Sequence, residues 1–327
     1  MHRIVALAVG LGALAGCGGE EAEPVARLAA DPMALTVAYG TYTGLGLTWQ
    51  PTAELEGASG EARVFLHLLD DDGGLARTFD HDIPGGWRVG RESSYRVPVY
   101  QSLLAPPLPP GTYSLTAGLY DAEGNRWPLT FEGERTGRHE YRVATVEVPA
   151  QGAELPAVQF SPTWSPTLAG ADRQVVAFRW LAGDGAIRLT DLPGPGTLWI
   201  ALVIPGPGAG GLTRRMLPEA GGGSEGDAGE AEEGAEDEGE GAEAEGAAAE
   251  TEAPGGEPRV SVEASCSGFT AQVSGEGRHD VEVPVTAGDA EEADCEVTLR
   301  PNYAMESPAG DEQTVLLEIL AWKPAGG

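Results

Sequence analysis

Short runs of alternating or continuous apolar residues, separated by turn signals, are the feature that most constrains the fold of this chain. The runs end at clusters of Gly, Pro, Asp or Asn, and helical periodicity is absent from the body of the chain. Alternation places successive side chains on opposite faces of a strand, so the sequence predicts an all-β protein. The predicted strands occupy residues 34–39, 45–49, 62–69, 75–79, 94–99, 112–120, 141–148, 175–180, 186–189, 197–204, 212–217, 260–264, 270–274, 279–285, 295–300 and 315–322.

The first group of strands predicts one domain at residues 27–149. The segment 70–74, Asp-Asp-Asp-Gly-Gly, is typical of a hairpin turn. Seven or eight strands in about 120 residues predict an immunoglobulin-like β-sandwich with a proper core. The runs at 64–70 and 118–121 resemble accessory β-sandwich modules of bacterial envelope proteins. That resemblance implies a fold but no catalytic residues.

The second predicted domain is divided in the sequence. Residues 158–218 and 259–324 each provide too few strands for a stable sandwich alone, so we expect them to form one sandwich together. Phe178-Arg179-Trp180 and the closing strand at 316–321 resemble a carbohydrate-binding-like jelly roll found on some bacterial surface proteins. The predicted architecture is therefore two β-sandwich domains, immunoglobulin-like and then jelly-roll-like.

An acidic low-complexity tract, residues 219–258, separates the two halves of the second domain. Fifteen of the 51 Asp and Glu residues lie in 219–257, which contains no Lys or Arg. Few apolar side chains and strong charge repulsion leave little to offset chain entropy, so we expect a disordered insertion. Cation buffering and capture of a basic partner are the alternatives to a solvated loop. The net charge of −31 argues against a nucleic-acid partner.

The N-terminal residues have the features of an export signal. A positive charge at Arg3 precedes an apolar run, 4–14, that is shorter than the roughly 20 residues of a membrane-spanning helix. The following Leu14-Ala15-Gly16-Cys17 resembles the lipobox of bacterial lipoproteins. This resemblance implies that a signal peptide, residues 1–16, is removed and that Cys17 is acylated.

Acylation would make the cell envelope the site of this protein. Residues 17–26 would tether the first domain to the membrane, and Gly18 in place of Asp favours the outer membrane over the inner one by the same resemblance. An ordinary cleaved signal with an accidental cysteine is the alternative.

Two cysteines remain once Cys17 is acylated. An even pair in an oxidising compartment predicts a disulfide between Cys266 and Cys295. Closing a loop of about thirty residues stabilises a protein by about 3–4 kcal/mol on the chain-entropy model. Two buried free thiols are the alternative, and the spacing lacks the paired ligands of a zinc site.

Acidic and histidine residues gather around the predicted hairpin and form a candidate metal site. His67, Asp70, Asp80 and His81 are close in sequence, and these residue types would suit Ca²⁺ or Zn²⁺. However, His81 stands where a calcium loop ends in glutamate. A turn made by Asp and Gly, with packed or exposed histidines, is the alternative. No other cofactor is expected, apart from the covalent lipid.

Aromatic residues provide a candidate glycan site. Trp87 and Trp127 lie in turn-like, polar surroundings and are the best candidates for stacking on a sugar ring, with core packing as the alternative. The common motifs of serine hydrolases, zinc proteases and phosphate loops are missing from the sequence, so we expect no enzyme.

These observations predict a lipid-anchored envelope protein that acts as a non-enzymatic binding or spacing scaffold. Its partners would be the membrane, through the lipid, and an envelope protein or glycan. A glycan-binding surface module and an enzyme with an unrecognised site are the alternatives.

Overall fold

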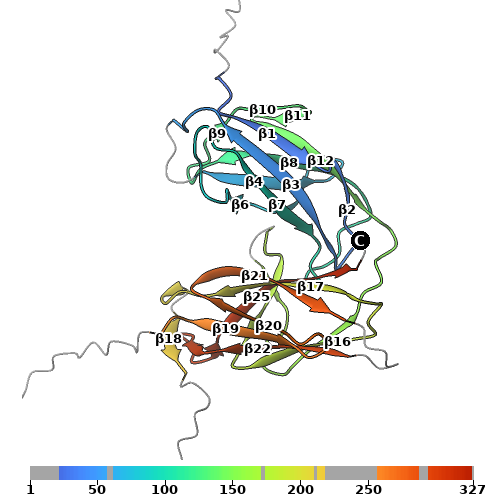
Figure 1. Cartoon of the computed structure of the whole chain (residues 1–327), viewed down its shortest axis with the longest axis vertical. Helices are drawn as coiled ribbons and strands as arrows, with labels where there is room; N and C mark the ends of the chain where they lie inside the picture. Colours follow the sequence, from blue (N-terminus) through green and yellow to red (C-terminus); the bar gives the residue numbers. More distant parts are fainter. Residues whose placement is uncertain are drawn as a thin grey trace, which may run out of the picture.

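Two β-sandwiches follow one another along the long axis of the protein (Figure 1). The computed structural model describes residues 22–56, 62–170, 174–209, 212–217, 256–286 and 294–325. These residues contain no helix, and so none long and apolar enough to cross a membrane. The all-β prediction is confirmed. The predicted signal peptide, Cys17 and the acidic tract up to residue 255 lie outside the described residues.

The first sandwich consists of strands β1 to β12. A four-stranded sheet has the order β10-β1-β3-β7, and an eight-stranded sheet follows β11-β12-β8-β4-β5, with β2, β6 and β9 paired to its strands. The strands are β1 (Ala26–Asp31), β2 (Ala34–Thr36), β3 (Tyr42–Pro51), β4 (Arg63–Leu69), β5 (Leu75–Thr78), β6 (His81–Asp82), β7 (Ser93–Tyr100), β8 (Gly111–Tyr120), β9 (Arg126–Trp127), β10 (Leu129–Phe131), β11 (Arg135–Gly137) and β12 (Glu140–Val148).

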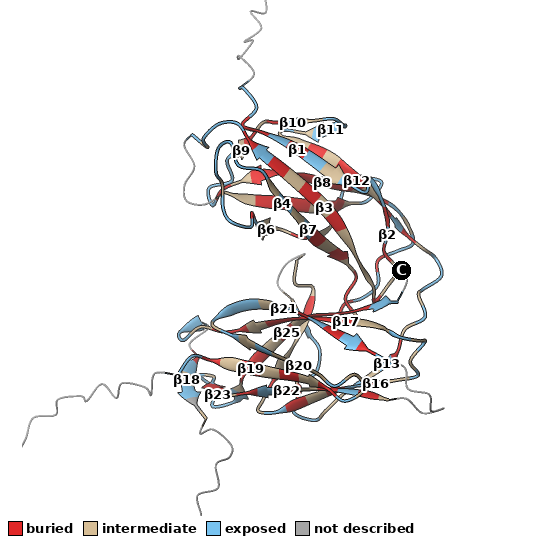
Figure 2. Cartoon of the chain, in the orientation of Figure 1, coloured by how far each residue is buried: buried red, intermediate tan, exposed pale blue. Residues whose placement is uncertain are grey.

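The core of this sandwich follows the alternation of its strands (Figure 2). In β4, Val64, Leu66 and Leu68 are buried in the core between the sheets. Each fully buried side chain of this kind contributes about 1.5–3 kcal/mol. The predicted hairpin is present, since β4 pairs antiparallel with β5.

Strand β1 is the longest of several strands that the sequence pattern did not predict. Ala26 faces the core, but Ala29 and Ala30 are about as apolar as Ala26, so the alternation between buried and exposed positions is weak in the sequence. Pairing on both sides, antiparallel to β3 and parallel to β10, fixes it in the sheet. Tertiary pairing therefore decided this strand.

The second sandwich consists of strands β13 to β25. Its two five-stranded sheets have the orders β13-β16-β22-β19-β20 and β14-β15-β25-β17-β21, and β18-β23-β24 form a small third sheet. The strands are β13 (Ala157–Phe160), β14 (Leu168–Ala169), β15 (Ala177–Leu181), β16 (Gly185–Thr190), β17 (Gly196–Ile204), β18 (Thr213–Met216), β19 (Arg259–Ala264), β20 (Phe269–Ser274), β21 (Gly277–Val285), β22 (Cys295–Pro301), β23 (Tyr303–Glu306), β24 (Glu312–Gln313) and β25 (Val315–Pro324).

Strands from both sides of the acidic tract share each large sheet. β16 pairs with β22, and β17 lies between β21 and β25. Each half therefore supplies neighbours that the other half requires for its backbone hydrogen bonds.

The sandwiches meet at an apolar junction on the outer face of β17 and β25. Trp199 packs against the rings of Tyr42 and Tyr100 from the first sandwich, with ring centroids 5.2 and 5.1 Å apart. Ala201, Ile319 and Ala321 complete this buried cluster. Because these residues face away from the core of their own sandwich, their burial depends on the first sandwich.

Backbone hydrogen bonds also cross this junction. β15 pairs with β25 only as far as Leu317, and the first sandwich occupies the edge beyond it. The Trp322 N–H donates to the Gly40 carbonyl, and the Leu103 N–H donates to the Leu320 carbonyl, both at 2.7 Å. Leu104 of the same loop is buried in the core of the second sandwich. The first sandwich thus completes part of the second sheet.

Candidate functional site

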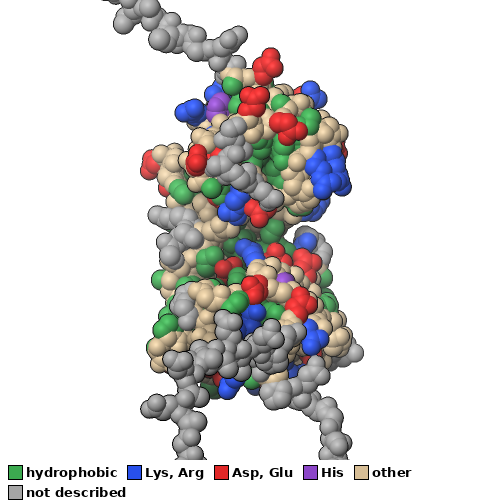
Figure 3. Space-filling model, turned by 90° about the vertical axis from the view of Figure 1, so that its left-hand side faces the viewer, with side chains coloured by type: hydrophobic (Ala, Val, Ile, Leu, Met, Phe, Trp, Pro, Cys, Tyr) green, Lys and Arg blue, Asp and Glu red, His purple; other side chains and the backbone are tan. Residues whose placement is uncertain are grey.

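A cleft of about 320 Å³, lined by charged and apolar side chains, lies between the two sandwiches beside the apolar junction. Charged side chains of both signs gather near the waist of the molecule (Figure 3). The cleft residues from the first sandwich are Arg63, Phe79, Asp80, His81, Asp82, Val97, Pro98 and Tyr100, and those from the second are Gln174, Arg278 and Asp280.

One ion pair comes from the first sandwich. The backbone pairing of β4 with β6 places Arg63 opposite Asp82, and the Arg63 Nε–H donates to Asp82 Oδ1 at 2.8 Å. Arg63 also donates to the Tyr120 hydroxyl at 3.4 Å. The Asp82 side chain is 75% exposed, so this carboxylate remains available to solvent or a ligand.

A second ion pair comes from β21 of the second sandwich. Arg278 and Asp280 are two residues apart and therefore share one face of the strand, with Nη2 to Oδ1 at 3.3 Å. Glu318 Oε2 lies 3.9 Å from Arg278 Nη1. Ala201 faces Ile319 and Leu202 faces Leu317, so Glu318 is the extra residue of a β-bulge.

Gln174 connects the two walls of the cleft. Its side-chain amide donates to the backbone carbonyl of Asp80 at 2.8 Å. The backbone carbonyl of Gln174 accepts a hydrogen bond from the Tyr100 hydroxyl at 3.4 Å. Burial raises the pKa of Tyr100 to about 12, so this hydroxyl keeps its proton at neutral pH.

Asp80 uses its carboxylate within the first sandwich. Oδ1 accepts from the Leu66 N–H at 3.1 Å, and Oδ2 accepts from the Tyr120 hydroxyl at 3.2 Å. His67 Nε2 lies 3.8 Å from Oδ1, beyond hydrogen-bond distance. Burial lowers the pKa of His67, which favours the neutral imidazole.

His81 belongs to a hydrogen-bonded chain that joins the two sheets of the first sandwich. Trp49 Nε1–H donates to the Tyr95 hydroxyl at 3.1 Å, and that hydroxyl lies 2.9 Å from His81 Nε2. His81 Nδ1 lies 2.8 Å from the Phe79 carbonyl. Burial lowers the pKa of His81, and the neutral ring with its proton on Nδ1 satisfies every partner.

The predicted metal residues do not come together. His67 approaches Asp80, whereas His81 joins the Tyr95 chain and Asp70 accepts from the Asp72 and Gly74 N–H groups of the hairpin turn. Within the described ranges, no group of three or more His, Cys, Asp or Glu residues is arranged to hold a metal ion. The metal-site prediction relied on proximity in sequence, but these side chains turn towards different neighbours in the structure.

The expectation that Trp127 is exposed is wrong. Its side chain is only 8% exposed, and Nε1 donates to the Glu56 carbonyl at 3.4 Å. Trp87 is half-buried against the first core and donates to the Ala53 carbonyl at 3.1 Å. Both indoles bind the backbone that follows β3, a contact that their polar sequence neighbours did not indicate.

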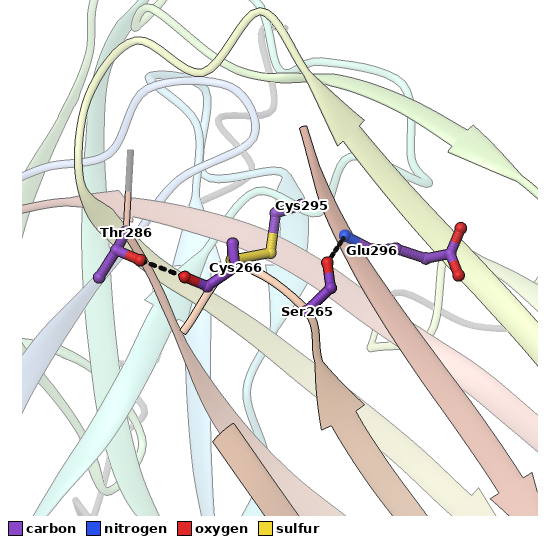
Figure 4. The surroundings of a disulfide bond; sticks show 5 residues. All are labelled: Ser265, Cys266, Thr286, Cys295 and Glu296. Carbon is purple, nitrogen blue, oxygen red and sulfur yellow. Dashed lines mark hydrogen bonds between the residues drawn. A yellow bond between two sulfur atoms is a disulfide. The ribbon is translucent and has the colours of Figure 1, made fainter. Parts of the chain in front are cut away.

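The predicted disulfide between Cys266 and Cys295 is confirmed (Figure 4). It joins the ends of the paired strands β19 and β22, with Cα atoms 4.9 Å apart. Ser265 and Glu296 form two hydrogen bonds beside it. The disulfide therefore extends an existing β-ladder.

Sequence reasoning missed Arg63, Gln174, Arg278 and Asp280 as cleft residues. The alternation in β21, with Arg278 and Asp280 outward and valines inward, was visible in the sequence. Alternation identifies an outward face, but it does not show which part of the chain lies opposite.

Comparisons with known proteins identify no family. No family model and no curated protein matches this chain. Solved structures with weak similarity include the α-2-macroglobulins of Salmonella, at 14% identity and a TM-score of 0.21, and of E. coli, at 10% and 0.21. The alignment covers 93% of this chain but 15% of each macroglobulin.

The adhesin InvE of Yersinia pseudotuberculosis is a further weak match. It shows 12% identity and a TM-score of 0.20, over 89% of this chain and 58% of the adhesin. These values are too low to support a conclusion about the function of this chain.

Proposed function

We propose that this chain is a lipid-anchored envelope protein that acts as a non-enzymatic binding or spacing scaffold. The observation that carries this proposal is the junction, where backbone hydrogen bonds and a buried aromatic cluster join the two sandwiches. A joint of this kind resists bending, because separating the sandwiches would expose Trp199 and the edge of β25.

The direction of the scaffold follows from the tether. The described chain enters the first sandwich at the end opposite the second one (Figure 1). With a lipid on Cys17, the five residues to Ala22 would span about 18 Å at most. The first sandwich would then lie near the membrane, and the second would project away from it.

A binding role fits the cleft better than catalysis. Both ring nitrogens of His81 form hydrogen bonds, to Phe79 and Tyr95. The Asp80 carboxylate accepts hydrogen bonds from Leu66 and Tyr120. These groups hold the structure in place and are poorly placed to exchange protons with a substrate. The partners of this scaffold would be the membrane and an envelope protein or glycan, with the outer membrane favoured by Gly18.

Lipid labelling of the full chain in a bacterial host tests this proposal. We expect the protein to incorporate a palmitate analogue and to sediment with membranes, and Cys17→Ser to lose both properties. A Cys266→Ser and Cys295→Ser double variant is the matched control and should keep the label. A label that persists in Cys17→Ser, or a wild-type protein in the soluble fraction, would contradict the anchor.

A further inference from the structure

The cleft presents two ion pairs, one from each sandwich. Arg63 with Asp82 comes from the first sandwich, and Arg278 with Asp280 from the second. The side chains of Asp82 and Asp280 are 75% and 51% exposed. Each pair therefore offers guanidinium donors together with carboxylate acceptors that are open to a ligand.

Less polar side chains complete the cleft. Pro98 is half-buried on the outward face of β7, and Val97 and Phe79 also line the space. The Phe79 and Tyr100 rings pack edge to face, with centroids 5.1 Å apart. Apolar surface beside convergent polar groups is typical of small-molecule sites, and 320 Å³ lies within their range of about 300–1,000 Å³.

The charges of the cleft select the class of ligand. Three aspartates and two arginines line it, within a chain of net charge −31, so an anion is disfavoured. A simple cation would compete with arginines that already hold the two exposed carboxylates. A neutral group with neighbouring hydroxyls is not repelled by the aspartates and does not compete with the arginines. Each hydroxyl can donate to a carboxylate and accept from a guanidinium.

We propose that the cleft binds a neutral sugar unit of a glycan between the Arg63–Asp82 and Arg278–Asp280 pairs. This site is separate from the tryptophans that the sequence suggested, and it requires both sandwiches. It gives the proposed scaffold a ligand class, yet it acts through residues that the lipid anchor does not involve.

Calorimetric titration of the full chain, purified in a detergent without a sugar head group, tests the ligand class. The probes are glucose, galactose, mannose and N-acetylglucosamine, with glucuronate and glucosamine as charged counterparts. We expect at least one neutral sugar to bind with a dissociation constant of about 1 mM or tighter, and more tightly than either charged counterpart. Absence of binding by every neutral sugar, or preference for a charged one, would overturn the proposal.

Substitutions then test the place of binding. Asp82→Ala and Asp280→Ala should each weaken binding about tenfold, since each removes hydrogen bonds to a charged acceptor. Both side chains are exposed, so thermal unfolding should show that the variants remain folded. Glu263→Ala is the matched control, because Glu263 pairs with Arg300 at similar exposure elsewhere in the second sandwich. Unchanged binding in both cleft variants, or equal weakening by Glu263→Ala, would refute this location.

Because these titrations use solubilised protein, their result is independent of lipid labelling. Absence of sugar binding would not contradict the anchored scaffold, and absence of the lipid would not contradict the sugar site.

Discussion

The apolar junction and the cleft lie side by side between the same two sandwiches, yet different interactions connect the sandwiches at each place. At the junction, Trp199 is 2% exposed and lies among aromatic rings, and strand edges share backbone hydrogen bonds. In the cleft, each wall carries its own exposed ion pair, and the Gln174 contacts connect the two walls. Buried apolar area stabilises far more than exposed ion pairs do, so the junction should hold the sandwiches together and leave the cleft free to bind.

Trp199→Ala should produce the largest loss, because it removes the central ring of the junction. We expect the free energy of unfolding to fall by about 3–5 kcal/mol, as for other buried aromatic truncations. Urea unfolding of the full chain measures the change. Trp87→Ala, at a half-buried ring in the first sandwich, is the control and should cost less. An equal or smaller cost for Trp199→Ala would contradict the role of this ring as the main stabilising contact of the junction.

Removal of the disulfide tests whether the junction couples the two sandwiches. Cys266→Ser with Cys295→Ser should lower stability by about 3–4 kcal/mol, because the loop of 29 residues is no longer closed. If the junction couples the sandwiches, both should still unfold in one transition at a lower temperature, measured by calorimetry. Two separated transitions, with the first sandwich unchanged, would show that the junction does not couple them.

Gly40→Ala should disturb the junction by a different route. Gly40 has a φ of +73°, and an added Cβ would lie 2.6 Å from Leu103 Cδ2 and 2.7 Å from Leu155 Cδ1. We expect a loss of about 1–3 kcal/mol in chemical denaturation. Gly73→Ala is the matched control, since its φ is +78° and an added Cβ meets nothing within 4 Å. Equal losses in the two variants would mean that backbone strain alone, and no clash at the junction, sets the cost.

Acidification should gradually lower the stability of the first sandwich. Burial lowers the pKa values of His67 and His81, so the unfolded chain binds protons more readily than the folded one. Stability should therefore fall as the pH drops through the ordinary histidine pKa of about 6.5. His81→Gln should flatten this dependence in melting curves recorded at several pH values. An unchanged slope would contradict the role given to His81.

Gln174→Ala should have the smallest effect. It removes the 2.8 Å bond to the Asp80 carbonyl, and one hydrogen bond contributes about 0.5–1.5 kcal/mol. Gln50→Ala, which removes the exposed bond to Glu92, is the control in the same denaturation assay. A loss as large as that of Trp199→Ala would show that the cleft, too, holds the sandwiches together.

Much of the fold could be predicted because strands carry their own signal. Alternation in β4 and β21 identified both strands and their inward faces, and the even pair of cysteines gave the disulfide. β17 carried a stronger signal, because its residues from Leu198 to Leu202 form an uninterrupted apolar run. The structure buries all of them. A continuous apolar run indicates burial on both faces, and the first sandwich supplies the second cover.

The candidate site was predicted less well because its contacts are distant in sequence. Tyr42 and Glu282, which bond at the junction, are 240 residues apart, and Gln174 lies 94 residues from Asp80. Local clustering pointed instead to His67, Asp70, Asp80 and His81, which the strands turn towards different neighbours. Trp127 misled for the same reason, since residue 56 covers it from a distant part of the chain.

By itself, the sequence determined the all-β class, most strands and the partner of each structural cysteine, because alternation, turn residues and cysteine number are local or countable properties. Only the tertiary structure decided that Trp199 and Ile319 would be covered by the other sandwich, and that Asp82 and Asp280 would line one cleft. The physical reason is that alternation separates the two faces of a strand, whereas the docking of whole sheets depends on shape and edges that many distant residues create together.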